Sequence, residues 1–191
     1  MTGPVDQDAL LLARFAQGDA GAARELTARL GSRAFALAVR VLGDRAEAED
    51  VAQDAMLRLW RVAPEWRTGE ARVSTWLYRV TLNLCTDVQR RKRGGTTALD
   101  DVAEPPDPGR TAPELLQDAA RAGALQAALM TLPDRQRQAV VLRHIEEMSN
   151  PEIAAIMDIS TEAVESLTAR GKRALAKKLI SQREELGYEH G

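Results

Sequence analysis

The chain has few of the residues that build disulfides, metal centres or catalytic sets. Its 191 residues include one cysteine, Cys85, and two histidines, His144 and His190, which are far apart in the sequence. A single cysteine excludes an internal disulfide, and we expect a cytoplasmic protein without a metal site. No serine, histidine and aspartate set or glycine-rich phosphate loop can be assembled, so we expect neither an enzyme nor a bound cofactor.

The sequence also lacks long apolar runs and an excess of positive charge. No stretch approaches the roughly 18 apolar residues of a membrane span. The N-terminus has neither a basic leader nor an apolar core, so we expect no export and no membrane insertion. The formal net charge is -2, which is unlike a protein that coats nucleic acid unaided. Any binding to nucleic acid must be local or assisted by a partner.

Helix-forming residues dominate, and the sequence predicts an all-α protein. Aromatic residues make up 4%, and no alternation of period two predicts a strand. Between Gly94 and Pro113 the helical periodicity stops, and the segment contains three glycines, four prolines and four acidic residues. Such a segment cannot bury a core or continue a helix. We therefore expect two small helical domains of about four helices each, residues 1–93 and 113–191, joined by a flexible acidic linker at residues 94–112.

The first domain is expected to contain helices at about residues 6–17, 21–42, 45–62 and 74–93. Apolar residues at three- and four-residue spacings predict the buried side of the first two helices. These residues are Leu10, Leu11, Phe15, Leu26, Leu30, Phe35, Leu37 and Val41. Gly31 and Ser32 are candidates for a bend in the second helix. Asp44 and Glu47 have the spacing of a capping box, which predicts the start of the third.

The second domain carries several helix start signals and a helix-turn-helix spacing. Thr111–Glu114 and Ser149–Glu152 have capping-box spacing, and Pro133 is tolerated in the first turn of a helix. A short helix ending at Met157, a tight turn and a last helix at about residues 161–183 have the spacing of a helix-turn-helix. The alternative is a plain helical hairpin whose charges form a solvated face.

The last helix has side chains that suit contacts with DNA. Short side chains near its N-terminus can approach base edges, and basic side chains further along can hold phosphates. The candidates are Thr161, Glu165, Ser166, Arg170, Lys172 and Arg173.

A second candidate DNA-binding helix spans residues 74–93. Its predicted buried stripe is Leu77, Val80, Leu84 and Val88. Its candidates for DNA contact are Thr75, Arg79, Asn83, Arg90, Arg91 and Arg93. In the loop before it, Trp66 is expected to be exposed as a platform for a base that has left its duplex. The alternatives are core packing, which we expect for Trp76, and a basic helix end that complements the macrodipole.

Four segments resemble the extracytoplasmic-function (ECF) sigma factors of bacterial RNA polymerase. They begin at Asp50, Ser74, Leu132 and Ser149, with the sequences DVAQDAMLRLWR, STWLYRVTLN, LPDRQR and SNPEIAAIMD. The segments follow the order of the family and cover nearly the whole chain. The predicted linker also lies where that family has one.

The resemblance implies a two-domain transcription initiation factor. The first domain would bind core polymerase and open the minus-ten promoter element, and the second would bind the minus-thirty-five element through its helix-turn-helix. The helix that docks on the polymerase beta-prime subunit corresponds to Asp50, Gln53, Asp54, Leu57 and Trp60. The base-capturing loop corresponds to residues 66–72, and Asn83 holds a base-contacting position.

The same resemblance implies three partners. They are core RNA polymerase, through its beta-prime and beta subunits, promoter DNA, and an anti-sigma factor that holds the protein inactive until a stress signal releases it. A competing hypothesis is a regulator that binds DNA without polymerase, in which residues 1–93 form a sensing or dimerisation domain.

The last helix departs from the commonest family pattern. Where many members have Gly-Thr-Val followed by a basic residue, Ser and Arg, this chain has Glu162-Ala-Val-Glu165-Ser-Leu167. Glu165 either accepts a hydrogen bond from a cytosine amino group or only weakens contact with the DNA backbone. The minus-thirty-five sequence therefore does not follow from the resemblance.

Overall fold

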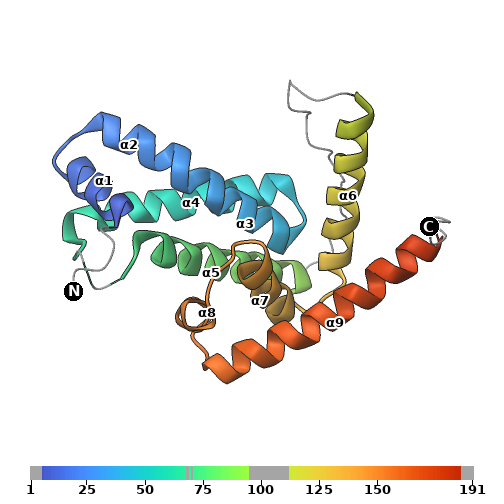
Figure 1. Ribbon diagram of the computed structural model, residues 1–191. Helices are drawn as coiled ribbons and strands as arrows, with labels where there is room; N and C mark the ends of the chain where they lie inside the picture. The colour runs from blue at the N-terminus through green and yellow to red at the C-terminus, as the bar shows by residue number, and fades with distance from the viewer. Residues whose placement is uncertain (1–5, 68, 70, 95–111, 186–191) are drawn as a thin grey trace. The chain divides into compact units, whose positions relative to one another are not determined.

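The computed structural model describes residues 6–67, 69, 71–94 and 112–185, with side chains described up to residue 94 and from 120 to 180. All regular elements in these residues are helices, which confirms the predicted all-α class (Figure 1). The chain divides into two compact units, the first containing α1 to α5 and the second containing α6, α7, most of α8 and α9. No helix in the described part is long and apolar enough to cross a membrane. The predicted linker lies almost wholly outside the described residues.

The first unit begins most of its helices with an aspartate cap. It contains α1 (Gln7–Ala16), α2 (Ala20–Leu26), the π-helical segment η1 (Thr27–Gly31), α3 (Ser32–Leu42), α4 (Arg45–Val62), the 3-10 turn η2 (Ala63–Glu65) and α5 (Val73–Gly94). Asp6, Asp19 and Asp44 accept hydrogen bonds of 2.8 to 3.1 Å from backbone N–H groups in the first turns of α1, α2 and α4. Each carboxylate accepts from a backbone N–H group that has no partner within the helix. Its negative charge also interacts favourably with the positive end of the helix dipole. The start of α4 at Asp44 is as predicted.

The predicted second helix is helical throughout but is not one regular helix. A π-helical turn, Thr27–Gly31, separates α2 from α3. A π turn places an extra residue in the turn, so the irregularity lies just before Ser32 and replaces the expected bend. Gly43 ends α3 in a left-handed conformation, with φ 72°, and its N–H donates to the Val39 carbonyl oxygen at 2.8 Å. The chain can therefore stop one helix and start α4 within two residues.

Buried leucines from the helices form the core of the first unit. They include Leu12, Leu26, Leu30, Leu37, Leu59 and Leu77. Helices α3, α4 and α5 pack against one another, and α1 packs against α2 (Figure 1). The prediction for Leu10 is wrong, because its side chain is 52% exposed. Three- and four-residue steps from the buried Asp8 lead to Leu11 and Leu12, so Leu10 points to the opposite side of α1.

The second unit contains the predicted helix-turn-helix. Its helices are α6 (Ala112–Met130), α7 (Asp134–His144), α8 (Asn150–Met157) and α9 (Thr161–Glu185). Pro133 is the N-cap residue of α7 and not a first-turn residue as predicted, since its ψ of 141° is extended. The Ser149–Glu152 capping box is confirmed, because Glu152 accepts from the Ser149 backbone N–H at 2.9 Å and the Ser149 hydroxyl accepts from the Glu152 N–H at 3.4 Å. The expected cap at Thr111 lies outside the described residues.

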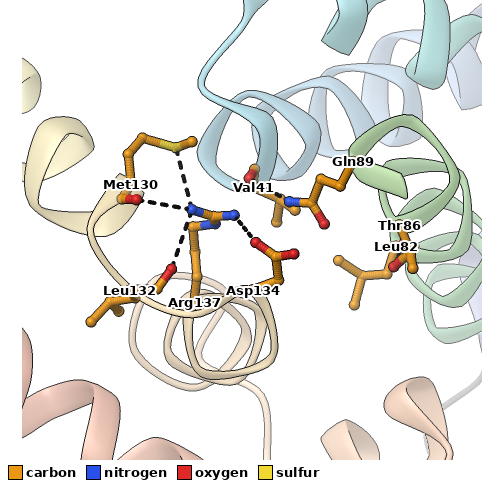
Figure 2. A network of polar contacts seen from close by, with 8 residues as sticks. All are labelled: Val41, Leu82, Thr86, Gln89, Met130, Leu132, Asp134 and Arg137. Carbon is orange, nitrogen blue, oxygen red and sulfur yellow. Dashed lines mark hydrogen bonds and ion pairs between the residues drawn. The ribbon is translucent and has the colours of Figure 1, made fainter. Parts of the chain in front are cut away.

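Arg137 holds the turn between α6 and α7. Its guanidinium pairs with Asp134 at 2.5 Å and donates to the carbonyl oxygens of Met130 and Leu132 at 3.4 and 3.5 Å. Figure 2 shows these residues around Arg137. The Arg137 side chain is 3% exposed, and a buried cation is stable only with such partners. The LPDRQR segment that resembles the family therefore has a structural role in this turn.

A glycine sets the approach of α9 to α7. Gly171 is buried, and a Cβ atom at this position would lie 2.5 Å from Cγ2 of Val140 and 3.3 Å from the carbonyl oxygen of Gln136. No other residue type fits without moving one helix. The close approach decides which face of α9 is left for solvent.

Candidate nucleic-acid interface

One face of α4 is exposed and carries most of the residues assigned to polymerase binding. Asp50 and Gln53 are exposed, Asp54 is half-buried and pairs with Arg58 at 3.1 Å, and Leu57 is 47% exposed. Their spacing of three and four residues places them on one side of the helix. The opposite side, with Val51, Ala55, Met56 and Leu59, is buried in the first unit. The face thus has an apolar centre with a charged rim.

Trp60, the last of the residues predicted to bind polymerase, is only partly exposed for contact with a partner. Its side chain is half-buried, and its ring centroid lies 4.4 Å from that of Phe15 in α1. This tilted contact with Phe15 covers part of the indole within the unit.

Helix α5 presents a continuous polar face. Arg79, Asn83, Thr86 and Arg90 are exposed at spacings of four, three and four residues, and Thr75 one turn earlier is half-buried. The other side of the helix is buried, including Leu77, Leu84, Cys85 and Val88. Val80 is half-buried and lies at the edge of the predicted stripe. The predicted division of α5 into an apolar and a polar side therefore holds.

The structure separates the four cations at the end of α5. Arg90 and Arg93 are exposed and continue the side of Asn83, with Arg90 paired to Asp87 at 2.8 Å. Arg91 is turned about 100° from Arg90, as any next residue in a helix is. It lines a groove between α4 and α5 together with Asp50 and Asp54 of α4. Arg91 is therefore not on the face that carries Asn83.

Lys92 is held by the start of α4. Its ammonium group lies 3.3 Å from a carboxylate oxygen of Asp44 and 3.3 Å from one of Glu47. The backbone N–H of Glu47 and then Lys92 hold the pKa of Asp44 below its ordinary value of 3.8, and partial burial opposes this shift. The end of α5 is in this way tied to the beginning of α4.

Trp66 is half-buried and not exposed as predicted. Its ring meets Trp76 edge-on, with centroids 6.0 Å apart and an interplanar angle of 89°. Together with Ala13, Ala16, Gln17, Ala63 and Pro64 it lines a shallow hollow. Its indole N–H is buried and has no hydrogen-bond partner in the part of the chain that the structure describes. A buried donor without a partner costs free energy in the folded state.

The exposed face of α9 changes charge along its length. Glu162 and Glu165 lie near its start, and the exposed Arg170, Lys172 and Arg173 lie further along. The backbone N–H of Glu162 itself and the Ser160 hydroxyl hold the pKa of Glu162 below its ordinary value of 4.5. Two other predicted contacts, Thr161 and Ser166, are half-buried.

Asn150 was not predicted as a site residue. Its Nδ2 donates to Oε1 of Glu165 at 3.3 Å, which joins the first turn of α8 to α9. The bond leaves the second carboxylate oxygen of Glu165 for another donor. No sequence signal marks this pair, because the turn between the helices decides which residues of α8 and α9 meet.

The comparisons with known proteins all lead to one family. The family model for Sigma-70 region 2 matches residues 26–95, and the model for Sigma-70, region 4 matches residues 122–175. The chain is 30% identical to the ECF RNA polymerase sigma factor SigW of Bacillus subtilis over 172 residues, which are 85% of this chain and 91% of that protein. It is 37% identical to the ECF RNA polymerase sigma factor SigM of Mycobacterium tuberculosis over 173 residues, 90% of this chain and 84% of that protein.

Among solved structures, the chain is similar to CnrH in its complex with the cytosolic domain of CnrY. The TM-score is 0.66 with 28% sequence identity, covering 91% of this chain and 97% of CnrH. The two family models, the curated relatives and the shared fold all lead to one assignment. The chain belongs to the ECF sigma factors of the sigma-70 family, which direct core RNA polymerase to promoters and initiate transcription.

Proposed function

We propose that residues 1–93 bind core polymerase and open the minus-ten element, and that residues 113–191 bind the minus-thirty-five element, with residues 94–112 as the linker. The exposed polar face of α5 carries this proposal. Arg79, Asn83 and Arg90 face solvent along three turns of a helix whose other side is fully used in the core. Polar and basic side chains in this arrangement suit a nucleic-acid strand.

The exposed face of α4 is the proposed contact with polymerase. Its residues are Asp50, Gln53, Asp54, Leu57 and Trp60. The exposed Leu57 supplies an apolar anchor, and Asp50 and Asp54 supply a charged rim, which is the anatomy of a protein interface. The partner surface is expected to be basic and to lie on the beta-prime subunit, and the beta subunit completes the core contact.

The loop before α5 and the polar face of α5 are the proposed minus-ten site. Trp66 would stack a flipped base. Thr75 and Asn83 would contact bases, and Arg79, Arg90 and Arg93 the backbone. Arg91 lies off this face, beside Asp50 and Asp54, so its contact with DNA has the least support of the set.

The exposed face of α9 is the proposed minus-thirty-five site. Its residues are Thr161, Glu165, Ser166, Arg170, Lys172 and Arg173. Because Asn150 orients one oxygen of Glu165, the other oxygen can accept from a cytosine amino group.

Replacing Glu165 by Lys tests whether this residue reads a base. We expect the E165K variant to lose its preference for cytosine at one minus-thirty-five position, because the acceptor is replaced by a donor. Transcription is measured from a set of promoters that carry each base at each position. An unchanged base preference would remove Glu165 from the set of reading residues and leave it as a modulator of backbone contact.

We also propose that the protein is cytoplasmic, has no enzymatic activity of its own, and is held inactive by an anti-sigma factor until a stress signal releases it. The similarity to CnrH, whose structure contains the cytosolic domain of CnrY, supports such a partner. The regulator hypothesis without polymerase is not favoured, because both matching family models belong to sigma factors.

The deciding experiment combines a core polymerase pull-down with run-off transcription. We expect the chain to be retained by core polymerase and to make the enzyme start at a specific promoter. Specific binding of the free chain to promoter DNA as a dimer, with no retention by core polymerase, would instead support the regulator hypothesis.

A further inference from the structure

Helix α1 lies outside the residues matched by the region 2 family model, which begin at residue 26. One side chain at its start nevertheless reaches α5. Oδ1 of Asp6 accepts from the Asp8 N–H at 3.1 Å, and Oδ2 of the same carboxylate accepts from the Val73 N–H at 3.0 Å. Val73 is the first residue of α5, so a single carboxylate caps two helices that are distant in the sequence.

The bond to Val73 satisfies a donor that α5 cannot satisfy itself. The first N–H groups of a helix have no acceptor within that helix, and a carboxylate there also interacts favourably with the helix dipole. The start of α5 therefore depends on α1 as well as on the loop that precedes it.

Helix α1 is itself firmly placed. Asp8, which is buried, pairs with Arg29 of η1 at 3.2 Å. At the other end of α1, the Phe15 ring contacts the Trp60 ring near the end of α4, with the two planes tilted by 47°. Asp6 thus belongs to a helix that is held in place at both ends. Its bond to Val73 links the first residue of α5 to that helix.

The loop that contains Trp66 is held by α1 at both ends. At its start, η2 packs on α1, and Trp66 shares a hollow with Ala13 and Ala16 of α1. At its end, Val73 is bound by Asp6. The proposed stacking residue and the first residue of the helix that carries Asn83 therefore both contact α1, while the rest of α5 packs on α3 and α4.

We propose that Asp6 is a positioning residue for promoter opening, which orients α5 and the Trp66 loop before DNA binds. This rests on the proposed role of α5 at the minus-ten element. Asp6 touches no DNA in this proposal and acts only through the position of α5.

The test uses Asp6→Asn in the full chain with core polymerase. Asparagine has one acceptor oxygen where aspartate has two, so it cannot accept from the Asp8 N–H and the Val73 N–H at the same time and the shared cap is lost. The matched control is Asp19→Asn. Asp19 caps α2 with one oxygen and pairs with the exposed Arg14 through the other, and it does not touch α5. Asp6→Ser, which also keeps a single capping oxygen, is the second variant.

We expect D6N and D6S to form open complexes on a duplex promoter about tenfold less well than the parent, because a hydrogen bond to a charged group is lost. D19N is expected to stay within about twofold, as an exposed ion pair contributes little. All variants should bind core polymerase like the parent. A promoter that is already mismatched over the minus-ten element should restore D6N, because opening is no longer required.

Two results would overturn the proposal: equal opening by D6N and D19N on duplex DNA, or a D6N defect of the same size on the mismatched promoter. The second result would assign Asp6 to general stability. Failure of the parent itself to start transcription with core polymerase would instead overturn the proposed function, so the two failures are distinguishable.

Discussion

At the scale of single residues, Gly171 is important for the packing of the second unit although it has no side chain. In most helix interiors glycine is destabilising relative to alanine. Here the missing side chain is what permits α9 to lie against Val140 and Gln136 of α7. Val140 is itself buried and cannot turn away. Helix propensity favours alanine at position 171, whereas the packing of α9 against α7 has room only for glycine. The packing is the larger effect here.

Replacing Gly171 by Ala is therefore expected to destabilise the protein by about 1 to 3 kcal/mol, as overpacked core substitutions do. The matched control is Gly123→Ala in α6, where an added Cβ meets nothing within 4 Å. This control is expected to gain up to about 1 kcal/mol from helix propensity. Urea unfolding followed by circular dichroism measures both. Stabilisation by both substitutions would contradict the close approach of α7 and α9.

Asp44 makes the stability of the first unit depend on pH. The Glu47 N–H and Lys92 hold its pKa in the folded state below the ordinary value of 3.8. A lowered pKa means that the carboxylate stabilises the fold above about pH 3.8, and that this contribution is lost as the pH falls through the folded-state value. Acid therefore weakens the junction between α4 and the end of α5.

We expect Asp44→Ala to cost about 1 kcal/mol at neutral pH through the lost cap. The cost should shrink as the pH falls below the ordinary pKa, because protonation removes the charge of Asp44 in the parent and leaves only a neutral capping oxygen. Asp44→Asn keeps the capping oxygen and should cost less at neutral pH. Thermal unfolding of the three proteins across the acid range measures this. An Asp44→Ala cost that is the same at about pH 2 as at neutral pH would argue against the charge of Asp44 as its source.

At the scale of elements, α5 combines two kinds of basic residue that look alike in the sequence. Lys92 lies 3.3 Å from Asp44 and from Glu47, so its charge is used within the first unit. Arg79 is exposed and forms no ion pair with any residue in the described part of the chain. Of these two residues, only Arg79 has a positive charge that is available to bind a DNA phosphate.

Arg79→Ala and Lys92→Ala are expected to separate these roles. Each phosphate contact that is lost lowers the slope of log affinity against log salt by about 1. We expect R79A to lower the slope of promoter binding by the holoenzyme by that amount and K92A to leave it unchanged while lowering thermal stability. Filter binding across a salt series provides the slopes. A lower slope for K92A would mean that its ion pairs break when DNA binds.

At the scale of the whole molecule, the net charge of the chain and the free energy needed to open promoter DNA both indicate that the protein needs a partner to bind and open a promoter. The net charge of -2 gives the free chain little general attraction to DNA. Flipping a base costs a few kcal/mol, and each further stacking step that opens costs about 1.4 kcal/mol. One stacking residue and one polar helix face can hold a base or two, so a longer bubble needs polymerase.

The free chain is therefore expected to bind duplex promoter weakly at physiological salt. Fluorescence anisotropy with a labelled promoter, with and without core polymerase, measures this. Addition of core polymerase should produce a specific complex that a mutated minus-ten element abolishes. Tight, sequence-specific binding by the chain alone would contradict the requirement for a partner.

Much of the local structure could be predicted from the sequence. The starts of α4 and α8 follow from Asp44 and the Ser149–Glu152 box, and the start of α9 follows from Ser160, whose hydroxyl accepts from the Ala163 N–H at 3.2 Å. Helix caps and helical periodicity involve residues that are at most four positions apart, so a short stretch of sequence is enough to predict them. Leu10 was predicted wrongly because a short helix allows more than one apolar arc.

The sequence alone determined the class of the fold, the starts of α4, α8 and α9 and the polar face of α5, because each depends on near neighbours. Only the tertiary structure decided that Asp6 caps α5, that Lys92 is bound by α4, and that Trp66 is half-buried. These contacts join residues that are remote along the chain, and no local pattern encodes which of them meet. They depend on the angles at which packed helices cross, and those angles are set by the core as a whole.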